Sequence, residues 1–343
     1  PSRTPIENLA DLEAALASIY AGQTALLDLS KRFGLDQVVS YMSKLRGLSS
    51  DRIMAKLALI PLAENSAEEF LDDGRRISVN ITLSDRLVID FTGTSAVHPG
   101  NLNATPAIVN GAVIYVLRIL SEQNIPLNEG IMDKVDLILP NSLLNPEFPE
   151  DANLCPAVVG GNTEISQRIV DTLLKCYGVI ACGQGTMNNF LFGDENFGYY
   201  ETIGGGSGAT IYHNGADGVH QHMTNTQITD AEILEFRYPV KLKEFSLRAH
   251  SGGSGKQYGG NGIIRSFEFK QPLTVTMLAQ HRVQEPYGLK GGDTGAIGQQ
   301  ILSDQHGRKK AIEGIATFEV KKGDQFTIYT PGGGGYGKKR PSE

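Results

Sequence analysis

The stretch that decides the fold is RRISVNITLSDRLVIDF, residues 75–91. Ile77, Val79 and Ile81 alternate with polar residues, and a second apolar run follows the turn at 83–86. Alternation with period two is typical of a strand that buries one face. The stretch therefore predicts a β-hairpin, and the helical patterns that surround it make a mixed α+β fold the expectation.

Two helical patterns precede the hairpin. From Ile6 to Phe33 the apolar residues recur at three- and four-residue spacing, and the pattern stops at Gly34. A second pattern covers 35–59, with a break predicted at 47–50. Because such stripes usually face a core, we expect an N-terminal helical hairpin whose apolar residues are packed inside the protein.

Four further segments have clear patterns before the second half of the chain. Residues 105–121 are apolar nearly all round, which predicts a buried central helix. Residues 135–139 predict a strand, and the Pro- and Asn-rich stretch 141–156 predicts a surface loop. A further helix is predicted over 164–177, with its end at Gly178.

Glycine distinguishes the second half. The 40 glycines are about 12% of the chain, against a usual ~7%. From residue 180 onward, short apolar and β-branched runs alternate with glycine clusters, which predicts many short strands in a mixed or antiparallel sheet system. We therefore expect a helical segment over 1–74 and an α+β core over 75–343, with a β-rich, glycine-rich C-terminal half. The clusters lie at 204–208, 252–255, 259–262, 291–298 and 332–337.

Composition excludes several classes of protein. The net charge of −7 argues against a nucleic-acid binder, because no large basic face is available for phosphates. The spacing of Cys155, Cys176 and Cys182 matches no zinc motif, and three cysteines suggest reduced thiols in the cytoplasm. No apolar run reaches the ~18 residues of a membrane span. Small molecules and other proteins are the expected partners.

The segment 218–226 contains two histidines in GVHQHMTNT. On an extended strand, His220 and His222 would lie on the same side, where two imidazoles can reach one metal or one substrate oxygen. The alternative is a pair of hydrogen-bonded histidines that fix a loop. Asn225 follows in the same segment and is a candidate substrate ligand.

The helix predicted from Glu164 is preceded by Gly160, Gly161 and Asn162. Free amide donors at such a helix start could receive an anion. The glycines are equally explained by close packing, and the full phosphate-loop pattern is missing, so this is a weak ATP site.

Amide and carboxylate side chains gather in two further segments. Asn188 and Asn189, with Glu201 after two tyrosines, form a set suited to orienting a polar amide or lactam. Glu201 is the strongest internal candidate for a general base, although a surface carboxylate is the commoner explanation for a single glutamate.

Taken in order, these segments resemble the hydantoinase B family, which includes the C-terminal region of ATP-dependent 5-oxoprolinase, the B subunit of N-methylhydantoinase, and the large subunits of acetone and acetophenone carboxylases. The resemblance runs from near Pro5 to the end of the chain. The motifs that carry it are IDFTGTS (89–95), GNLNA (100–104), GNTE (161–164) with SQR (166–168), QGTMNN (184–189), YET (200–202), HQHMTNT (220–226), PYGL (286–289) and PGGGGYG (331–337).

The resemblance implies a division of labour. A hydantoinase A-type partner binds ATP with Mg and phosphorylates a carbonyl oxygen, and the B part completes the chemistry on the activated intermediate. Full-length members begin well before Pro1, and a divalent metal is expected only in that N-terminal half, so we expect this chain to be a C-terminal portion. The predicted site has Glu201, His220 and His222 as catalytic residues, Asn162, Glu164, Asn188, Asn189 and Asn225 as substrate-binding residues, and no metal.

The expected function is part of an ATP-dependent cyclic amide hydrolase of the 5-oxoprolinase or N-methylhydantoinase type. It would open a lactam or hydantoin ring after phosphorylation by the partner. The expected partners are a hydantoinase A-type subunit or domain, the N-terminal half of hydantoinase B, and a small cyclic amide, in an oligomer. Two alternatives stay open: a subunit of an acetone or acetophenone carboxylase, and a noncatalytic scaffold of such a complex.

Overall fold

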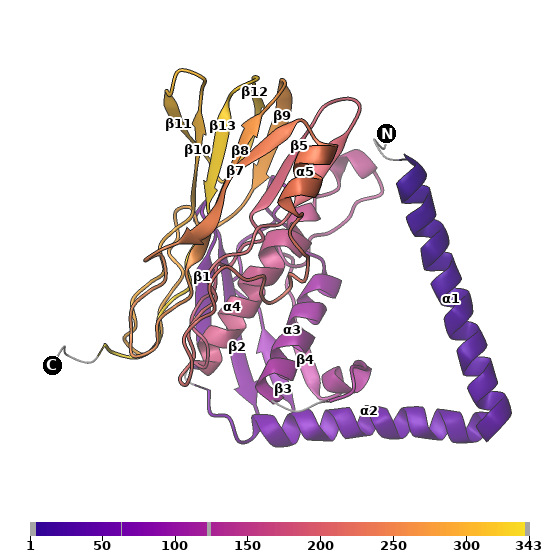
Figure 1. Ribbon diagram of the computed structural model, residues 1–343. Coiled ribbons are helices and arrows are strands. Elements are labelled where there is room, and N and C mark those ends of the chain that lie inside the picture. The colour runs from indigo at the N-terminus through magenta and orange to yellow at the C-terminus, as the bar shows by residue number, and fades with distance from the viewer. Residues whose placement is uncertain (1–4, 63, 122–124, 340–343) are drawn as a thin grey trace.

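The computed structural model describes residues 5–62, 64–121 and 125–339, and it has the mixed helix and sheet architecture that was predicted (Figure 1). The helices are α1 Pro5–Phe33, α2 Leu35–Leu57, α3 Pro106–Ser121, α4 Ser166–Tyr177 and α5 Ala231–Arg237. The strands are β1 Ser66–Phe70, β2 Arg76–Leu83, β3 Leu87–Asp90, β4 Val135–Ile138, β5 Asn189–Gly193, β6 Gly198–Glu201, β7 Val240–Arg248, β8 Gly262–Phe269, β9 Leu273–Leu278, β10 Gln299–Ser303, β11 Lys309–Ile312, β12 Ile315–Val320 and β13 Gln325–Tyr329.

The first half folds around the predicted hairpin. Strands β2 and β3 pair antiparallel, with Ile81 opposite Ile89, and β3 continues into β4 as a parallel neighbour, so the sheet order is β1-β2-β3-β4. Helix α4 packs on β1 and β2, and α3 packs on α4. The predicted helices over 105–121 and 164–177 are confirmed, and α4 ends at Gly178 in the left-handed conformation.

The second half contains two antiparallel sheets, with orders β11-β10-β13-β8-β7 and β12-β9-β5-β6. Aromatic side chains fill the space between them: the Phe190 ring stacks on Phe267 at 4.7 Å and on Phe326 at 5.7 Å between centroids. The glycine clusters form loops in which backbone lies directly on backbone. A Cβ on Gly333 would lie 2.0 Å from the Ser207 carbonyl oxygen, so no larger residue fits there.

Helix α2 runs without interruption through 47–50, and the predicted break is wrong. Gly47 costs about 1 kcal/mol relative to alanine in a helix. That cost is offset because the helix packs directly after it: Ser49, Ser50 and Ile53 are buried. Tertiary packing therefore overrides the local signal.

The core packing predicted for the first helix is also wrong. The expected pair of helices is present, joined at Gly34, but the two open away from each other, and α1 stands apart from the body of the protein (Figure 1). No described residue of α1 is buried. Strand β1 lies within the 1–74 segment for which only helices were expected, so its helical part ends at Leu57.

Of the helices in the described ranges, none combines the length and the apolar character that crossing a membrane requires.

Candidate functional site

Helix α4 carries a stripe of charged side chains although it lies inside the protein. Eleven of its twelve residues are buried. Arg168, Asp171 and Lys175 follow Glu164 at spacings of four, three and four residues, which places all four near one face. Glu164 belongs to the short helical turn Gly161–Ile165 that leads into α4. This polar face is the centre of the candidate site.

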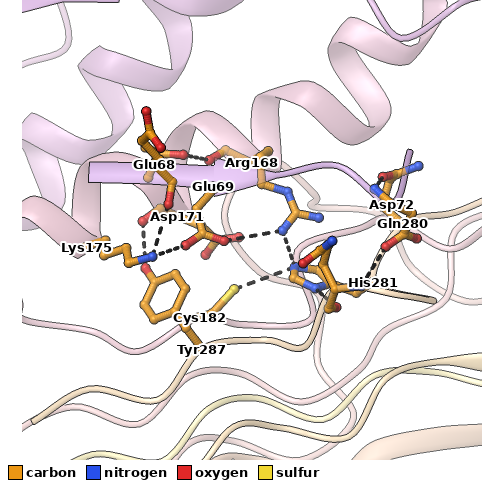
Figure 2. A network of polar contacts seen from close by, with 12 residues as sticks. Glu68, Glu69, Asp72, Arg168, Asp171, Lys175, Cys182, Gln280, His281 and Tyr287 are labelled. Atoms are coloured by element: carbon orange, nitrogen blue, oxygen red, sulfur yellow. Dashed lines mark hydrogen bonds and ion pairs between the residues drawn. The ribbon is translucent and has the colours of Figure 1, made fainter. Parts of the chain in front are cut away.

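Two cations of the stripe meet buried groups from distant segments (Figure 2). The Lys175 ammonium lies 2.5 Å from one carboxylate oxygen of Glu69, and the Arg168 guanidinium lies 3.7 Å from the other. Burial raises the pKa of Glu69, although both cations act to lower it. Lys175 also lies over the ring of Tyr287, 4.7 Å from its centroid. The network ties α4 to β1 and to the loop after residue 280.

His281 is held in one tautomer by its neighbours. Nη1 of Arg168 lies 2.6 Å from His281 Nε2, and Nδ1 lies 2.6 Å from the Gln284 carbonyl oxygen (Figure 2). A guanidinium only donates, so Nε2 accepts and Nδ1 carries the hydrogen that is donated to Gln284. Burial, together with the charge of Arg168, keeps the pKa of His281 well below its usual value. The imidazole is therefore neutral.

Three potential metal ligands meet beside Arg168. The ligand atoms of Asp171, Cys182 and His281 all lie within 4.8 Å of one another. However, the His281 lone pair that would bind an ion already accepts from Arg168, and burial raises the pKa of the Cys182 thiol well above its usual value. A protonated thiol and an occupied imidazole do not fit a divalent metal, because the guanidinium already supplies the positive charge at this position.

His222 joins this network from the other side. Its Nε2 lies 3.4 Å from Asp171 Oδ1, and its Nδ1 lies 3.3 Å from the Tyr115 hydroxyl. Both carboxylate oxygens of Asp171 are buried without a hydrogen-bond partner among the described residues. Tyr115 in turn lines a cavity of about 580 Å³ beside Arg118. Asp171, His222 and Tyr115 thus form a polar path from the protein interior to this cavity.

The predicted strand placement of the two histidines is wrong. His222 has a φ of 56°, a left-handed turn conformation, so the segment is not extended and the two imidazoles do not share a strand face. His220 is half-buried, and burial lowers the pKa of its imidazole. No described residue makes a hydrogen bond to its Nδ1.

Glu201 lies in a buried ion pair. Arg265 donates to both of its oxygens, at 2.8 and 3.1 Å, and the Tyr199 hydroxyl donates at 2.7 Å. The two charged side chains are only 1% and 3% exposed. A carboxylate that accepts three hydrogen bonds under the sheets has no contact with a cavity, so the geometry argues against the general-base role predicted for it.

Three predicted amide ligands take separate positions. The Asn188 side chain donates to Gln184 Oε1 at 2.7 Å and to the Ile203 carbonyl oxygen at 3.0 Å, which fixes a buried turn. Asn162 and Asn225 are exposed. The structure therefore does not bring these three together.

Glu164 and Asn189, by contrast, meet at a cavity. The Asn189 amide donates to Glu164 Oε1 at 2.7 Å, and its oxygen accepts from the Tyr200 hydroxyl at 2.7 Å. Asn189 and Tyr200 line a cavity of about 500 Å³ whose apolar wall includes Leu191 and Met277. Burial raises the pKa of Glu164 to about 8, so its carboxyl group is largely protonated at neutral pH.

A second cavity adjoins this one at Ile315 and has a volume of about 610 Å³. Arg282 lines it and donates to Gln300 Oε1 at 2.9 Å and to the Gln280 carbonyl oxygen at 2.8 Å. Burial lowers the pKa of Arg282 to about 10, opposed by the charge of Glu164. Its Nη2 has no hydrogen-bond partner in the described part of the chain. Together the cavities pair a neutral acid with a buried cation.

The glycines before α4 have a packing role. A Cβ on Gly160 would lie 2.6 Å from the Asn101 carbonyl oxygen, and one on Gly161 would lie 2.5 Å from that of Asn103. The backbone, rather than a phosphate, occupies the space that these glycines leave. The weak ATP site considered from the sequence gains no support from this geometry.

Sequence reasoning missed Arg168, Asp171, His281 and Arg282 as members of the site. A signal was present for the first two, because four charged residues at helical spacing on an otherwise apolar helix indicate a buried polar face. Nothing local distinguished His281 and Arg282, which reach the site through a loop.

Comparisons with known proteins agree over the whole chain. The Hydantoinase B/oxoprolinase family profile matches residues 1–339. The chain is 41% identical to 5-oxoprolinase 1 of Arabidopsis thaliana, over 96% of this chain and 27% of that protein, so it spans about a quarter of the relative's length. The crystal structure of an ATP-dependent caprolactamase from Pseudomonas jessenii superposes with a TM-score of 0.83 and 23% identity, covering 98% of this chain and 62% of that one.

An acetone carboxylase structure shares the fold more distantly, with a TM-score of 0.74 and 14% identity over 91% of this chain and 50% of that one. At these identities the two solved structures show the fold alone. The profile and the 5-oxoprolinase relative carry the assignment: the chain belongs to the hydantoinase B/oxoprolinase family.

Proposed function

We propose that this chain forms part of an ATP-dependent cyclic amide hydrolase and that the ring binds in the cavity beside Asn189 and Tyr200. The observation that carries this proposal is the buried series Glu164–Asn189–Tyr200, which ends at a cavity of about 500 Å³. That volume is in the range of small-molecule sites. The 5-oxoprolinase relative at 41% identity favours a lactam as the substrate.

The lining suits a small ring with one polar edge. Leu191, Met277 and Leu278 provide apolar contact for the ring carbons. The hydroxyl groups of Tyr200 and Thr276 lie on the same lining and can hydrogen-bond to an amide edge. Glu164 acts as a positioning residue, because its Oε1 accepts from the Asn189 amide and thereby orients the group that accepts from Tyr200.

In the proposed reaction the ring C–N bond breaks, the carbonyl carbon gains an oxygen from water, and the nitrogen gains a proton. Phosphorylation of the carbonyl oxygen makes that carbon electrophilic; we assign this step, with ATP and Mg, to a hydantoinase A-type partner. The divalent metal of the family is assigned to polypeptide outside this chain. A lactam or hydantoin ring, an oligomeric complex and a cytoplasmic location complete the proposal.

Two tyrosines provide a matched test. Tyr200→Phe and Tyr115→Phe each remove one hydroxyl group, at the proposed cavity and at the cavity of about 580 Å³ respectively. In 5-oxoproline-dependent ATP hydrolysis by the assembled enzyme, we expect Tyr200→Phe to raise KM about tenfold, equivalent to one hydrogen bond of ~1.4 kcal/mol, and Tyr115→Phe to leave KM unchanged.

The reverse pattern would move the substrate to the Tyr115 cavity. If a ketone with bicarbonate stimulated ATP consumption and 5-oxoproline did not, the chain would be part of a carboxylase, and the proposed substrate class would be wrong.

A further inference from the structure

Helix α1 presents a large apolar surface that the described chain does not cover. Ten large apolar side chains of the helix are exposed, from 41% at Leu29 to 79% at Ile6. An isolated helix gains little stability in water, and most helical stability in proteins comes from packing of an apolar face. The members are Ile6, Leu9, Leu12, Leu16, Ile19, Tyr20, Leu26, Leu27, Leu29 and Phe33.

The apolar residues follow a coiled-coil spacing. Starting at Leu9, steps of three and four residues reach Leu12, Leu16 and Ile19, and the same series continues to Leu26 and Phe33. Only Gln23 and Ser30 interrupt it with polar side chains. A stripe that repeats every 3.5 residues drifts slowly around a straight helix, and two such helices bury it by winding around each other.

The helix is held away from the body on an anchored support. The C-terminal half of α2 is fixed because Ser49, Ile53 and Leu57 are buried, and Arg46 donates to both oxygens of Asp133 at 2.9 Å. Beyond this anchor α1 extends beside the protein without lying on it (Figure 1). Its 29 residues span about 43 Å, which leaves room for a second helix along its length.

Charge along α1 is polarised. Glu7, Asp11 and Glu13 lie in its first half, and Lys31 and Arg32 lie in its last turn. A parallel pair of α1 helices would bring like charges together at both ends. An antiparallel pair brings acidic ends to basic ends, and opposite charges in such positions select orientation and partner.

We propose that α1 pairs antiparallel with α1 of a second copy of this chain. In the register that matches the stripe, Leu9 meets Phe33 of the partner subunit and Leu16 meets Leu26 of the partner subunit. Ten side chains that each leave roughly 100 Å² exposed offer on the order of 1,000 Å² per copy, comparable with the ~800 Å² per partner of stable interfaces. This inference is independent of the proposed function.

The first test is the mass of the chain in solution, by sedimentation equilibrium. We expect a dimer at micromolar concentration and a monomer for Leu16→Lys with Ile19→Lys. Leu59→Lys, at a side chain 77% exposed outside α1, is the matched control and should remain dimeric. Circular dichroism should show all variants folded, since α1 contributes no residue to the described core. A monomeric parent chain, or a dimeric double variant, would overturn the proposal.

Charge reversal tests self-complementarity. One variant replaces Glu7, Asp11 and Glu13 with Lys, and another replaces Lys31 and Arg32 with Glu. Each alone should be monomeric, because both ends then carry the same sign, and a mixture should form a heterodimer. Failure of the mixture to associate would contradict the charge argument.

Cross-linking tests the orientation. In a Cys155→Ser background, Leu9→Cys should form a disulfide-linked dimer only when mixed with Phe33→Cys. Cross-linking of either variant with itself would indicate a parallel pair and overturn the proposed register.

Discussion

The buried pair of Glu201 and Arg265 allows a direct test of whether Glu201 supports the fold or performs chemistry. Glu201→Gln keeps the shape of the side chain but turns one of two acceptor oxygens into a donor that faces the Arg265 guanidinium. The variant loses one or two charge-assisted hydrogen bonds of about 1.5–3 kcal/mol each and leaves the guanidinium buried without its counter-charge. We expect the free energy of unfolding to fall by about 3–5 kcal/mol, the usual effect of breaking a buried ion pair.

The assay is urea unfolding followed by circular dichroism, with an exposed pair as control. Arg86 donates to both oxygens of Asp136 at 2.6 Å, the same two-point geometry, but the two side chains are 42% and 46% exposed. Asp136→Asn should therefore cost less than about 1 kcal/mol. Replacing both buried residues, as Glu201→Leu with Arg265→Met, should recover part of the stability lost by either single change.

The reasoning is refuted if Glu201→Gln leaves the urea midpoint unchanged while 5-oxoproline-dependent ATP hydrolysis by the assembled enzyme disappears. That outcome would restore Glu201 as the general base that the sequence suggested. Loss of stability and activity together, with the double variant regaining both, would establish the structural role.

Two further predictions concern stability. The pKa of Glu164, raised from 4.5 to about 8, means that the folded protein holds a proton that the unfolded chain releases, so stability present below about pH 4.5 is lost as the pH rises to about 8; urea midpoints between pH 4 and 9 should show this decline, and Glu164→Gln should flatten it. Gly333→Ala places a methyl group 2.0 Å from the Ser207 carbonyl oxygen and should strongly lower the melting temperature, whereas Gly47→Ala, with nothing within 4 Å, should raise stability by up to about 1 kcal/mol; equal effects of the two would contradict the close-packing account.

Local periodicity predicted most of the first half correctly. The alternation at Ile77, Val79 and Ile81 marks the inward face of β2, and all three side chains are buried. The apolar stripe that continues through Leu173 and Leu174 marks α4 in the same way. These predictions hold because a strand or helix that packs on one side requires a repeat of two or of about 3.6 residues.

The same rule failed for α1, since a periodic stripe shows that a face needs cover and not what covers it. The break predicted at 47–50 failed because packing at Ile53 outweighs a local preference of about 1 kcal/mol. For the site, Glu164 and Asn189 were selected from their residue types and the structure brings them together, whereas Glu201 was selected on the same grounds and lies in an ion pair.

The sequence by itself determined the helical and strand periods, the glycine-rich loops of the second half and, through its ordered motifs, the family. Only the tertiary structure decided which charged groups neutralise one another. Arg168 and His281 are 113 residues apart in the chain, and Glu201 and Arg265 are 64 apart. No local pattern links such positions, because the energy of a buried charge depends on which distant partner the fold places beside it.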